Sequence, residues 1–193
     1  MFMEKSQKNL ETGRLIMRPW REDDASELFR YARDPRVGPI AGWPPHTSEE
    51  DSRNVIRNVL SVPETYAIVL KETGLPVGSI GLKSGDGTDL TEEPDECELG
   101  YWIGVPYWGR GLVTEAGNEM LRHAFEDLGM KAVWCGYYDG NERSKRVQEK
   151  LGFSYHHTTP DAPVPLLDET RIGHVNYMSK ADWIQAQCGE RSH

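Results

Sequence analysis

Hydrophobic and polar positions along the 193-residue chain follow two periods, one typical of strands and one typical of helices. Runs rich in β-forming residues predict strands at residues 14–21, 65–72, 77–84, 97–103, 131–138, 153–158 and 170–179. Apolar residues three and four positions apart predict helices at about residues 24–34, 49–60, 112–128 and 141–151. The predicted order is therefore strand, two helices, three strands, helix, strand, helix and two strands.

Capping residues and a proline set the ends of the first two helices. Asp23 or Asp24 can cap the first helix, and Asp34-Pro35 ends it. Ser48 and Asp51 fit a capping box at the start of the second helix. The residues expected to face inward are Ala25, Leu28, Phe29 and Ala32 in the first helix and Val55, Ile56, Val59 and Leu60 in the second. The Gly/Pro-rich segment 37–47 between these helices is predicted to be an ordered loop.

The third helix has the strongest amphipathic pattern, and Gly129 suits its C-terminal cap. Its expected buried stripe consists of Val113, Ala116, Met120, Ala124 and Leu128. A proline-rich segment, residues 158–167, is expected to divide the last two strands. Consecutive hairpins make antiparallel neighbours, which excludes a purely parallel doubly wound sheet. Because no repeat, low-complexity tract or linker divides the chain, we predict a single α/β domain.

Composition narrows the class of protein. The chain has 37% apolar and 27% charged residues, with 22 Lys and Arg against 31 Asp and Glu, giving a net charge of −9. This balance excludes a general nucleic-acid binder and favours cationic partners such as amines. Three distant cysteines without a CxxC pair exclude a zinc ribbon and indicate reduced thiols in a cytoplasmic protein. No apolar stretch is long enough for a membrane span or a signal peptide.

The negative charge is concentrated in one segment. Residues 86–98 contain seven acidic residues and no basic residue. A run of this kind is typical of a solvated loop, and it can also recruit a cation. Both interpretations stay open at the level of the sequence.

The most informative segment is a strand that leads through Gly109-Arg110-Gly111 directly into the third helix. Glycines let the backbone approach a ligand closely, and the start of a helix offers unpaired N–H groups, so the segment suits a phosphate or pyrophosphate. A P-loop requires Lys and then Ser or Thr after the second glycine, where Leu112 and Val113 stand. A dinucleotide fingerprint requires a third Gly or Ala, where Thr114 stands. Both common nucleotide-binding motifs are therefore excluded.

Two motifs carry a resemblance to a known family. The segment ELGYWIGVPYWGRGLVTEA resembles the acyl-CoA-binding core of the GCN5-related N-acetyltransferases, with Pro106 where the family loop usually begins with Arg or Gln. The segment that runs from Asn141 through Ser144, Val147 and Leu151 to Phe153 is similar to the N-x-x-S-x-x-V-x-x-K-L-G-F signature of the RimJ/RimL-like branch. The opening RLIMRPWREDDASELFRYARDP and the closing MSKADW also resemble that branch.

The resemblance implies a fold and a domain organisation. It implies a mixed, mostly antiparallel sheet that is splayed between the fourth and fifth strands, with the thioester arm of acetyl-CoA in that cleft and helices on both sides. It assigns residues 1–13 to an N-terminal extension, 14–183 to the acetyltransferase domain and 184–193 to a C-terminal tail. It implies acetyl-CoA as cosubstrate, no metal, and a monomer or homodimer that binds neither nucleic acid nor membrane.

The resemblance also assigns the residues that hold the cosubstrate. The thioester carbonyl would accept a hydrogen bond from a backbone N–H at the end of the fourth strand, within Ile103, Gly104 and Val105. The pyrophosphate would lie on backbone N–H groups of Gly109, Arg110, Gly111, Leu112 and Val113. Asn141 and Ser144 would contact the acyl-CoA, and Ser144 would protonate the departing thiolate. For Asn141, an ordinary helix cap is the alternative role.

The general base and the acceptor site follow from the same resemblance. Glu98 matches a glutamate that often acts as base through a water, and a surface carboxylate is the alternative role. Strand alternation places Glu98 on the same face as Gly100 and Trp102. Further candidates for the base are Asp168 and Glu169, whereas adjacent His156 and His157 should face opposite ways in a strand. The acceptor is expected to contact Trp43, Trp102 and Tyr138.

The implied reaction is direct transfer of an acetyl group to a primary amine. With a pKa of about 7.8, roughly a third of an N-terminal α-amine is neutral near pH 7.5, against about 0.1% of a lysine amine. This difference favours a protein N-terminus or a small-molecule amine as acceptor. The alternative is a non-catalytic acyl-CoA-binding regulatory module that keeps the fold without turnover.

Overall fold

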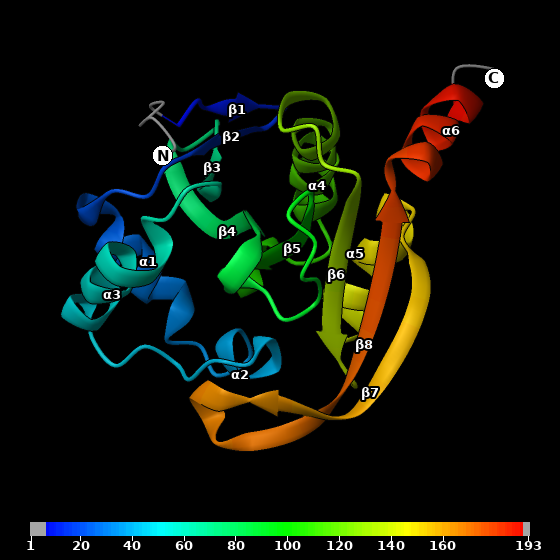
Figure 1. Ribbon diagram of the computed structural model, residues 1–193. Helices are drawn as coiled ribbons and strands as arrows, with labels where there is room; N and C mark the ends of the chain where they lie inside the picture. The colour runs from blue at the N-terminus through cyan, green and yellow to red at the C-terminus, as the bar shows by residue number, and fades with distance from the viewer. Residues whose placement is uncertain (1–6, 191–193) are drawn as a thin grey trace.

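The computed structural model describes residues 7–190, which form one eight-stranded sheet in the order β1-β2-β3-β4-β5-β6-β8-β7 (Figure 1). Neighbouring strands are antiparallel except β5 and β6, which are parallel. The strands are β1 (Leu10–Glu11), β2 (Leu15–Arg18), β3 (Thr65–Leu70), β4 (Leu75–Lys83), β5 (Glu96–Ile103), β6 (Ala132–Tyr138), β7 (Ser154–Val164) and β8 (Glu169–Ser179). The predicted mixed, mostly antiparallel sheet is confirmed.

Helices cover both faces of this sheet. They are α1 (Ala25–Ala32), α2 (Gly38–Ala41), α3 (Glu49–Val55), α4 (Leu112–Arg122), α5 (Glu142–Leu151) and α6 (Lys180–Glu190). Short 3-10 turns lie at Glu22–Asp24, Gly85–Gly87, Val105–Tyr107 and Pro165–Leu167, and π-helical turns continue α3 (Ile56–Leu60) and α4 (His123–Asp127). Within residues 7–190, none of these helices has the length and apolar character needed to cross a membrane.

The alternation of β3 explains the two hydrophobic cores. Ile68 and Leu70 belong to the larger core, which includes the buried stripe of α4. Ala67 and Val69 point the other way, into a smaller core with α1 and the end of α3. Figure 1 shows α1 and α3 side by side. The sheet is therefore covered on both faces at β3, and two neighbouring strands separate further along it.

That separation lies between β5 and β6. The two strands pair only from Glu96 to Glu98, opposite Ala132 to Trp134. Beyond this point β5 stays with β4 as far as Ile103, and β6 stays with β8 as far as Tyr138. The sheet thus forks after Glu98, as the resemblance implies for the fourth and fifth predicted strands.

The first helix differs from its prediction at both capping and packing. The Asp24 carboxylate does not cap α1; it lies buried against Arg18, at 2.7 and 2.8 Å, and accepts the Arg21 N–H at 2.9 Å. A buried arginine competes successfully for the carboxylate because an unpaired buried charge is costly. Tyr31, rather than Phe29, is the buried aromatic residue of α1, and its ring packs against Gly104.

Two residues that were expected to face inward, one after α3 and one after α4, are exposed for the same reason. Val59 is 57% exposed and Leu128 is 37% exposed. Each follows the start of a π-helical turn, whose wider winding rotates the following residues away from the face that the α-helical period predicts. Ser48 does cap α3, through the Asp51 N–H at 3.0 Å, but the Asp51 carboxylate turns to the Thr47 N–H at 2.8 Å.

The predicted loops contain regular structure. The expected loop 37–47 includes the short helix α2, which Gly42 ends at φ +93°. β7 continues through most of the proline-rich segment to Val164, which is possible because β7 lies at the edge of the sheet. The expectation for His156 and His157 is wrong: a bulge interrupts the alternation of β7, and their Nδ1 atoms lie 2.8 Å apart.

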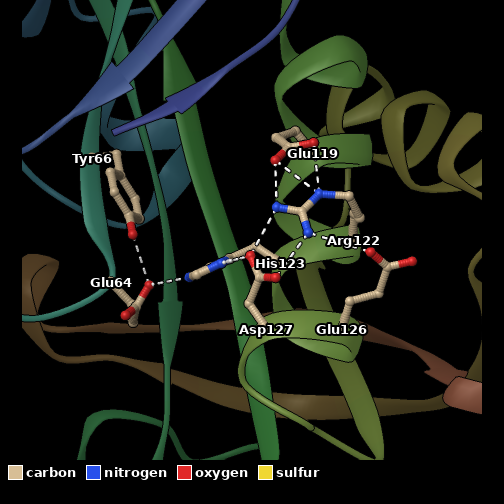
Figure 2. A network of polar contacts seen from close by, with 7 residues as sticks. All are labelled: Glu64, Tyr66, Glu119, Arg122, His123, Glu126 and Asp127. Carbon is tan, nitrogen blue, oxygen red and sulfur yellow. Dashed lines mark hydrogen bonds and ion pairs between the residues drawn. The ribbon is translucent and has the colours of Figure 1, made fainter. Parts of the chain in front are cut away.

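A polar network fixes the far end of α4 to β3 (Figure 2). His123 bridges Glu64 and Asp127, each at 2.8 Å, while Tyr66 donates to Glu64 at 2.8 Å and Arg122 pairs with Asp127 at 2.8 Å. Hydrogen bonding to Glu64, reinforced by Asp127, raises the pKa of His123 above its ordinary value despite burial. The opposite, N-terminal end of α4 faces the fork and remains available for other contacts.

Candidate functional site

A cavity of about 330 Å³ lies at the fork between β5 and β6. Its walls come from β5, the turn after it, the first turn of α4, one side of α5, and α2. Of the residues expected to bind a cosubstrate, those lining it are Ile103, Gly109, Gly111, Leu112, Val113, Asn141 and Ser144. The segments that begin at Tyr101 and at Asn141, 40 residues apart in the sequence, therefore line the same cavity.

The glycine loop forms one end of this cavity. Gly109 and Gly111 both have a φ of +72°, a backbone conformation that favours glycine. The first main-chain bond of α4 runs from the Glu115 N–H to the Gly111 carbonyl, at 3.0 Å. The N–H groups of Leu112, Val113 and Thr114 thus have no acceptor within the helix. This is the arrangement that binds phosphate at a helix start.

The loop is held in place from the N-terminal part of the chain. Arg14 donates to the Arg110 carbonyl at 3.0 Å, and its Nε lies 2.6 Å from the Glu115 carboxylate. Thr12 donates its hydroxyl to the same carboxylate at 2.6 Å. Arg110 does not line the cavity; its guanidinium lies 5.5 Å from the Tyr107 ring centroid. Contacts across about 100 residues therefore support the shape of the loop.

Asn141 and Ser144 begin α5 at the other side of the cavity. The Asn141 side chain caps the helix by accepting the Ser144 N–H at 3.2 Å. The Ser144 hydroxyl lies 2.9 Å from the Tyr101 hydroxyl and accepts the Gln148 amide N–H at 3.2 Å. Gln148 is fully buried and its carbonyl oxygen accepts from Asn176 at 2.7 Å. Ser144 is therefore held by Tyr101 of β5 and by Asn141 and Gln148 of its own helix.

Tyr101 is the site residue that the sequence prediction missed. It lines the cavity from β5, on the opposite face to Glu98 and Trp102. Burial raises the pKa of Tyr101 well above its ordinary value, and hydrogen bonding to Ser144 only partly offsets this. The phenol consequently stays protonated at neutral pH. The sequence did contain a signal for this residue: the strand alternation that places Glu98 and Trp102 on one face of β5 places Tyr101 on the opposite face.

Glu98 lies at the apex of the fork, outside the cavity lining that contains Ser144. Its carboxylate accepts from Thr88 at 2.7 Å and pairs with Lys83 at 3.3 Å. The fork separates Glu98 from the Tyr101 side of the sheet. Close to the fork, Cys135 of β6 donates its Sγ–H to the Leu99 carbonyl of β5 at 3.2 Å. The structure thus places the expected base and the expected acid on opposite faces of the fork.

The three residues expected at the acceptor site lie on two sides of α2. Trp43 and Trp102 are in edge contact, with ring centroids 5.7 Å apart. Tyr138 ends β6 below Gly42, where an added Cβ would lie 3.0 Å from its ring. Trp102 lines the cavity, whereas Trp43 and Tyr138 do not.

Gly104 and Val105 also lie outside the cavity lining. The Gly104 N–H donates to the Val77 carbonyl at 2.9 Å, so this donor is already engaged. A Cβ at Gly104 would lie 2.6 Å from the Tyr31 ring, which explains the glycine by packing. Ile103 reaches the cavity, and its carbonyl accepts the Trp108 indole N–H at 3.0 Å.

Basic side chains gather along the cavity, and among residues 7–190 no acidic side chain lines it. The basic members of the lining are Arg36, Arg143, Arg146 and Lys150. This contrasts with the net charge of −9 of the whole chain. The site therefore suits a polyanionic ligand that carries an apolar arm past Ile103, Leu112 and Val113.

Comparison with known proteins agrees with this geometry. The sequence model described as "Acetyltransferase (GNAT) domain" matches residues 14–154. The uncharacterized N-acetyltransferase p20 of Bacillus licheniformis is 28% identical over 151 residues, which cover 76% of this chain and 82% of that protein. The FsC-acetyl coenzyme A-N(2)-transacetylase of Aspergillus fumigatus is 27% identical over 196 residues, covering 95% and 81%.

The fold is also similar to that of solved structures. The crystal structure of the acetyltransferase (GNAT family) from Bacillus anthracis superposes with a TM-score of 0.78 at 20% identity. The match covers 90% of this chain and 99% of the other. At this identity the likeness concerns the fold.

Proposed function

Because the chain belongs to the acetyltransferase (GNAT) domain family and is an acetyl-CoA-dependent N-acyltransferase, we propose that it acetylates a primary amine by direct attack in a ternary complex. The proposed acceptor is a protein or peptide N-terminal α-amine or the amine of a small molecule. The observation that carries this proposal is the single cavity at the fork, which joins the start of α4 to the Tyr101–Ser144 pair.

The lining residues fit acetyl-CoA. The N–H groups of Leu112, Val113 and Thr114 would hold the pyrophosphate, and the space beside the glycines leaves room for it. An added Cβ at Gly109 would meet no atom within 4 Å, and one at Gly111 would have its nearest neighbour, Arg14, at 3.8 Å. Acetyl-CoA supplies the acetyl group as a thioester. The basic side chains of the lining complement its phosphates.

Ser144 and Tyr101 would manage the proton of the departing thiol. The Ser144 hydroxyl is positioned by Gln148 and by the Tyr101 hydroxyl, so it can donate its proton to the departing thiolate. The proton that the attacking amine loses restores the balance through solvent. Burial raises the pKa of Tyr101, so the phenol stays protonated and serves as a fixed hydrogen-bond partner of Ser144. General acid catalysis of this kind contributes about 10²–10⁴-fold to a rate.

Glu98 would act on the other face of the fork, where the amine arrives. Its hydrogen bond from Thr88 and its ion pair with Lys83 fix the carboxylate at the apex of the fork. A water between Glu98 and the incoming amine would carry the proton away. An α-amine needs little such help, because about a third of it is already neutral near pH 7.5. The name N(2)-transacetylase of the Aspergillus relative supports an amine as acceptor.

The direct test measures thiol release from acetyl-CoA with a panel of amines, including N-terminal peptides, lysine derivatives and small α-amines. The proposal expects release that depends on the acceptor and that is faster with α-amines than with lysine side chains. Tight CoA binding together with thiol release that no amine accelerates would instead support the non-catalytic binding module.

A further inference from the structure

A second cavity, of about 440 Å³, adjoins the one at the fork. Arg36, Ile40, Trp108 and Arg143 line both cavities. Pro35, Pro39 and Arg171 line only the second. We call it the arginine pocket after Arg36, Arg143 and Arg171, and its lining contains no acidic side chain from the part of the chain that the structure describes.

The three arginines are not equivalent. Arg36 makes a bidentate pair with Asp34, at 2.9 and 2.7 Å. Arg171 pairs with Glu169 and donates to the Pro39 carbonyl at 2.6 Å. Arg143 has no carboxylate within ion-pair distance among residues 7–190. The pocket therefore keeps an uncompensated positive charge at Arg143.

Trp108 holds this guanidinium in place. The Arg143 Cζ lies 3.9 Å from the Trp108 ring centroid, so the guanidinium stacks on the indole face. The indole itself is fixed by its N–H bond to the Ile103 carbonyl at 3.0 Å. Stacking leaves the N–H edge of the guanidinium free to bind a carboxylate or phosphate in two places at once. A stacked, unpaired arginine of this kind is prepared for an anion.

Arg171 places the pocket near the expected acceptor residues. Its guanidinium lies 5.4 Å from the Tyr138 ring centroid, and its bond to the Pro39 carbonyl joins β8 to α2. Tyr138 in turn lies against Gly42, at the end of α2. Arg171 of β8 and Pro39 of α2 thus form a side of the pocket that the cavity at the fork does not share.

We propose that the arginine pocket binds an anionic group of the acceptor, so that the preferred acceptor is a primary amine that also carries a carboxylate or phosphate. This inference rests on the proposed function and narrows its substrate class. Glu98 is the last residue of the acidic segment 86–98. One molecule with both charges would therefore be guided by its amine toward Glu98 and by its anion toward Arg143.

The test compares two amidated dipeptides, Ala-Glu and Ala-Gln, which share the same N-terminal amine and differ in one side-chain negative charge. The expected kcat/KM ratio favours the anionic member by about tenfold, the size of one hydrogen bond to a charged group. Arg143→Gln and Arg171→Gln should each bring the ratio toward one, and Arg143→Lys should keep part of it. Arg30→Gln, an exposed arginine outside both cavities, is the matched control. A wild-type ratio near one, or a ratio that neither variant changes, overturns the proposal.

A phosphate of CoA is the other anionic group that the arginine pocket could bind. Two binding measurements distinguish a CoA phosphate from the anionic group of the acceptor. If Arg143→Gln weakens binding of CoA much more than that of dephospho-CoA, the pocket serves CoA and the proposal is wrong. The second measurement titrates the CoA-loaded protein with N-acetylalanine and with N-acetylalaninamide. The charged member should bind more tightly in wild type only. Because this readout needs no turnover, it tests the pocket even if no amine supports thiol release, a result that would refute the proposed function alone.

Discussion

Replacing Ser144 by Ala tests the proposed proton donor while disturbing little else. The substitution removes the Oγ contacts to Tyr101 at 2.9 Å and to Gln148 at 3.2 Å. It keeps the helix cap, because Asn141 accepts the Ser144 backbone N–H. Tyr101 retains its hydrogen bond to the Ser144 carbonyl at 3.2 Å, so the phenol is not left without a partner. Two lost hydrogen bonds of about 1 kcal/mol each limit the stability loss to about 2 kcal/mol.

The expected loss of activity is larger than this structural cost. Loss of a general acid lowers kcat by about 10²-fold or more, equivalent to roughly 3 kcal/mol. Initial rates with saturating acetyl-CoA should show that decrease, while the Kd for CoA, measured by calorimetry, changes only slightly. The deficit should shrink above pH of about 9, because a thiol with a pKa near 8.5 then departs without a proton.

The control is Ser26→Ala, which removes an exposed hydroxyl from α1 and should leave kcat unchanged. A Ser144→Ala enzyme with a wild-type kcat at pH 7 would refute the assignment. A kcat deficit of the same size at pH 7 and pH 10 would show that Ser144 contributes by packing and not by proton donation.

Three further predictions follow from other contacts. Gly111→Trp should weaken CoA binding by at least about tenfold, because the indole would fill the phosphate loop. Gly111→Asn should weaken CoA binding less, because asparagine tolerates φ +72°. Equal effects of the two substitutions on the Kd for CoA in calorimetry would refute the steric argument. His123→Gln should lower the free energy of unfolding, measured in urea, more at pH 6 than at pH 9. Because the pKa of His123 is raised in the folded state, its stabilisation is complete below the ordinary pKa of 6.5 and is lost as pH rises through the folded-state pKa. A loss of unfolding free energy that does not depend on pH would contradict this prediction. Asp89→Asn, combined with neutralisation of the other exposed carboxylates of residues 86–95, should raise the KM for the acceptor and flatten the salt dependence of that KM. An unchanged KM would show that the segment is only a solvated loop.

Local patterns predicted the elements and much of the cavity lining. Alternation defined β5, and Gly109, Gly111, Asn141 and Ser144 all reached the same cavity. The elements could be predicted because each depends on residues close together in the sequence, and the resemblance, which rests on two contiguous motifs, indicated these four residues of the lining. The cap of Asn141 and the end of α5 at Gly152, with φ +88°, are of the same local kind.

Features that no simple sequence period describes were missed. The Arg14 contact to Arg110 joins residues 96 positions apart, and no local period indicates it. The π-helical turns after α3 and α4 rotate Val59 and Leu128 outward, and a helical period of 3.6 cannot anticipate them. Asp24 looked like a cap because its partner Arg18 lies in a preceding strand, where sequence spacing does not show the contact.

The most direct test of direct transfer follows the acetyl group itself. A single turnover with acetyl-CoA and a peptide α-amine is stopped at intervals, and the intact masses of enzyme and peptide are measured together with the released thiol. The account predicts one acetyl group on the peptide amine for each thiol released, with none on the enzyme at any time. An acetylated enzyme that forms before the acetylated peptide, or thiol released without acetylated peptide, would contradict it.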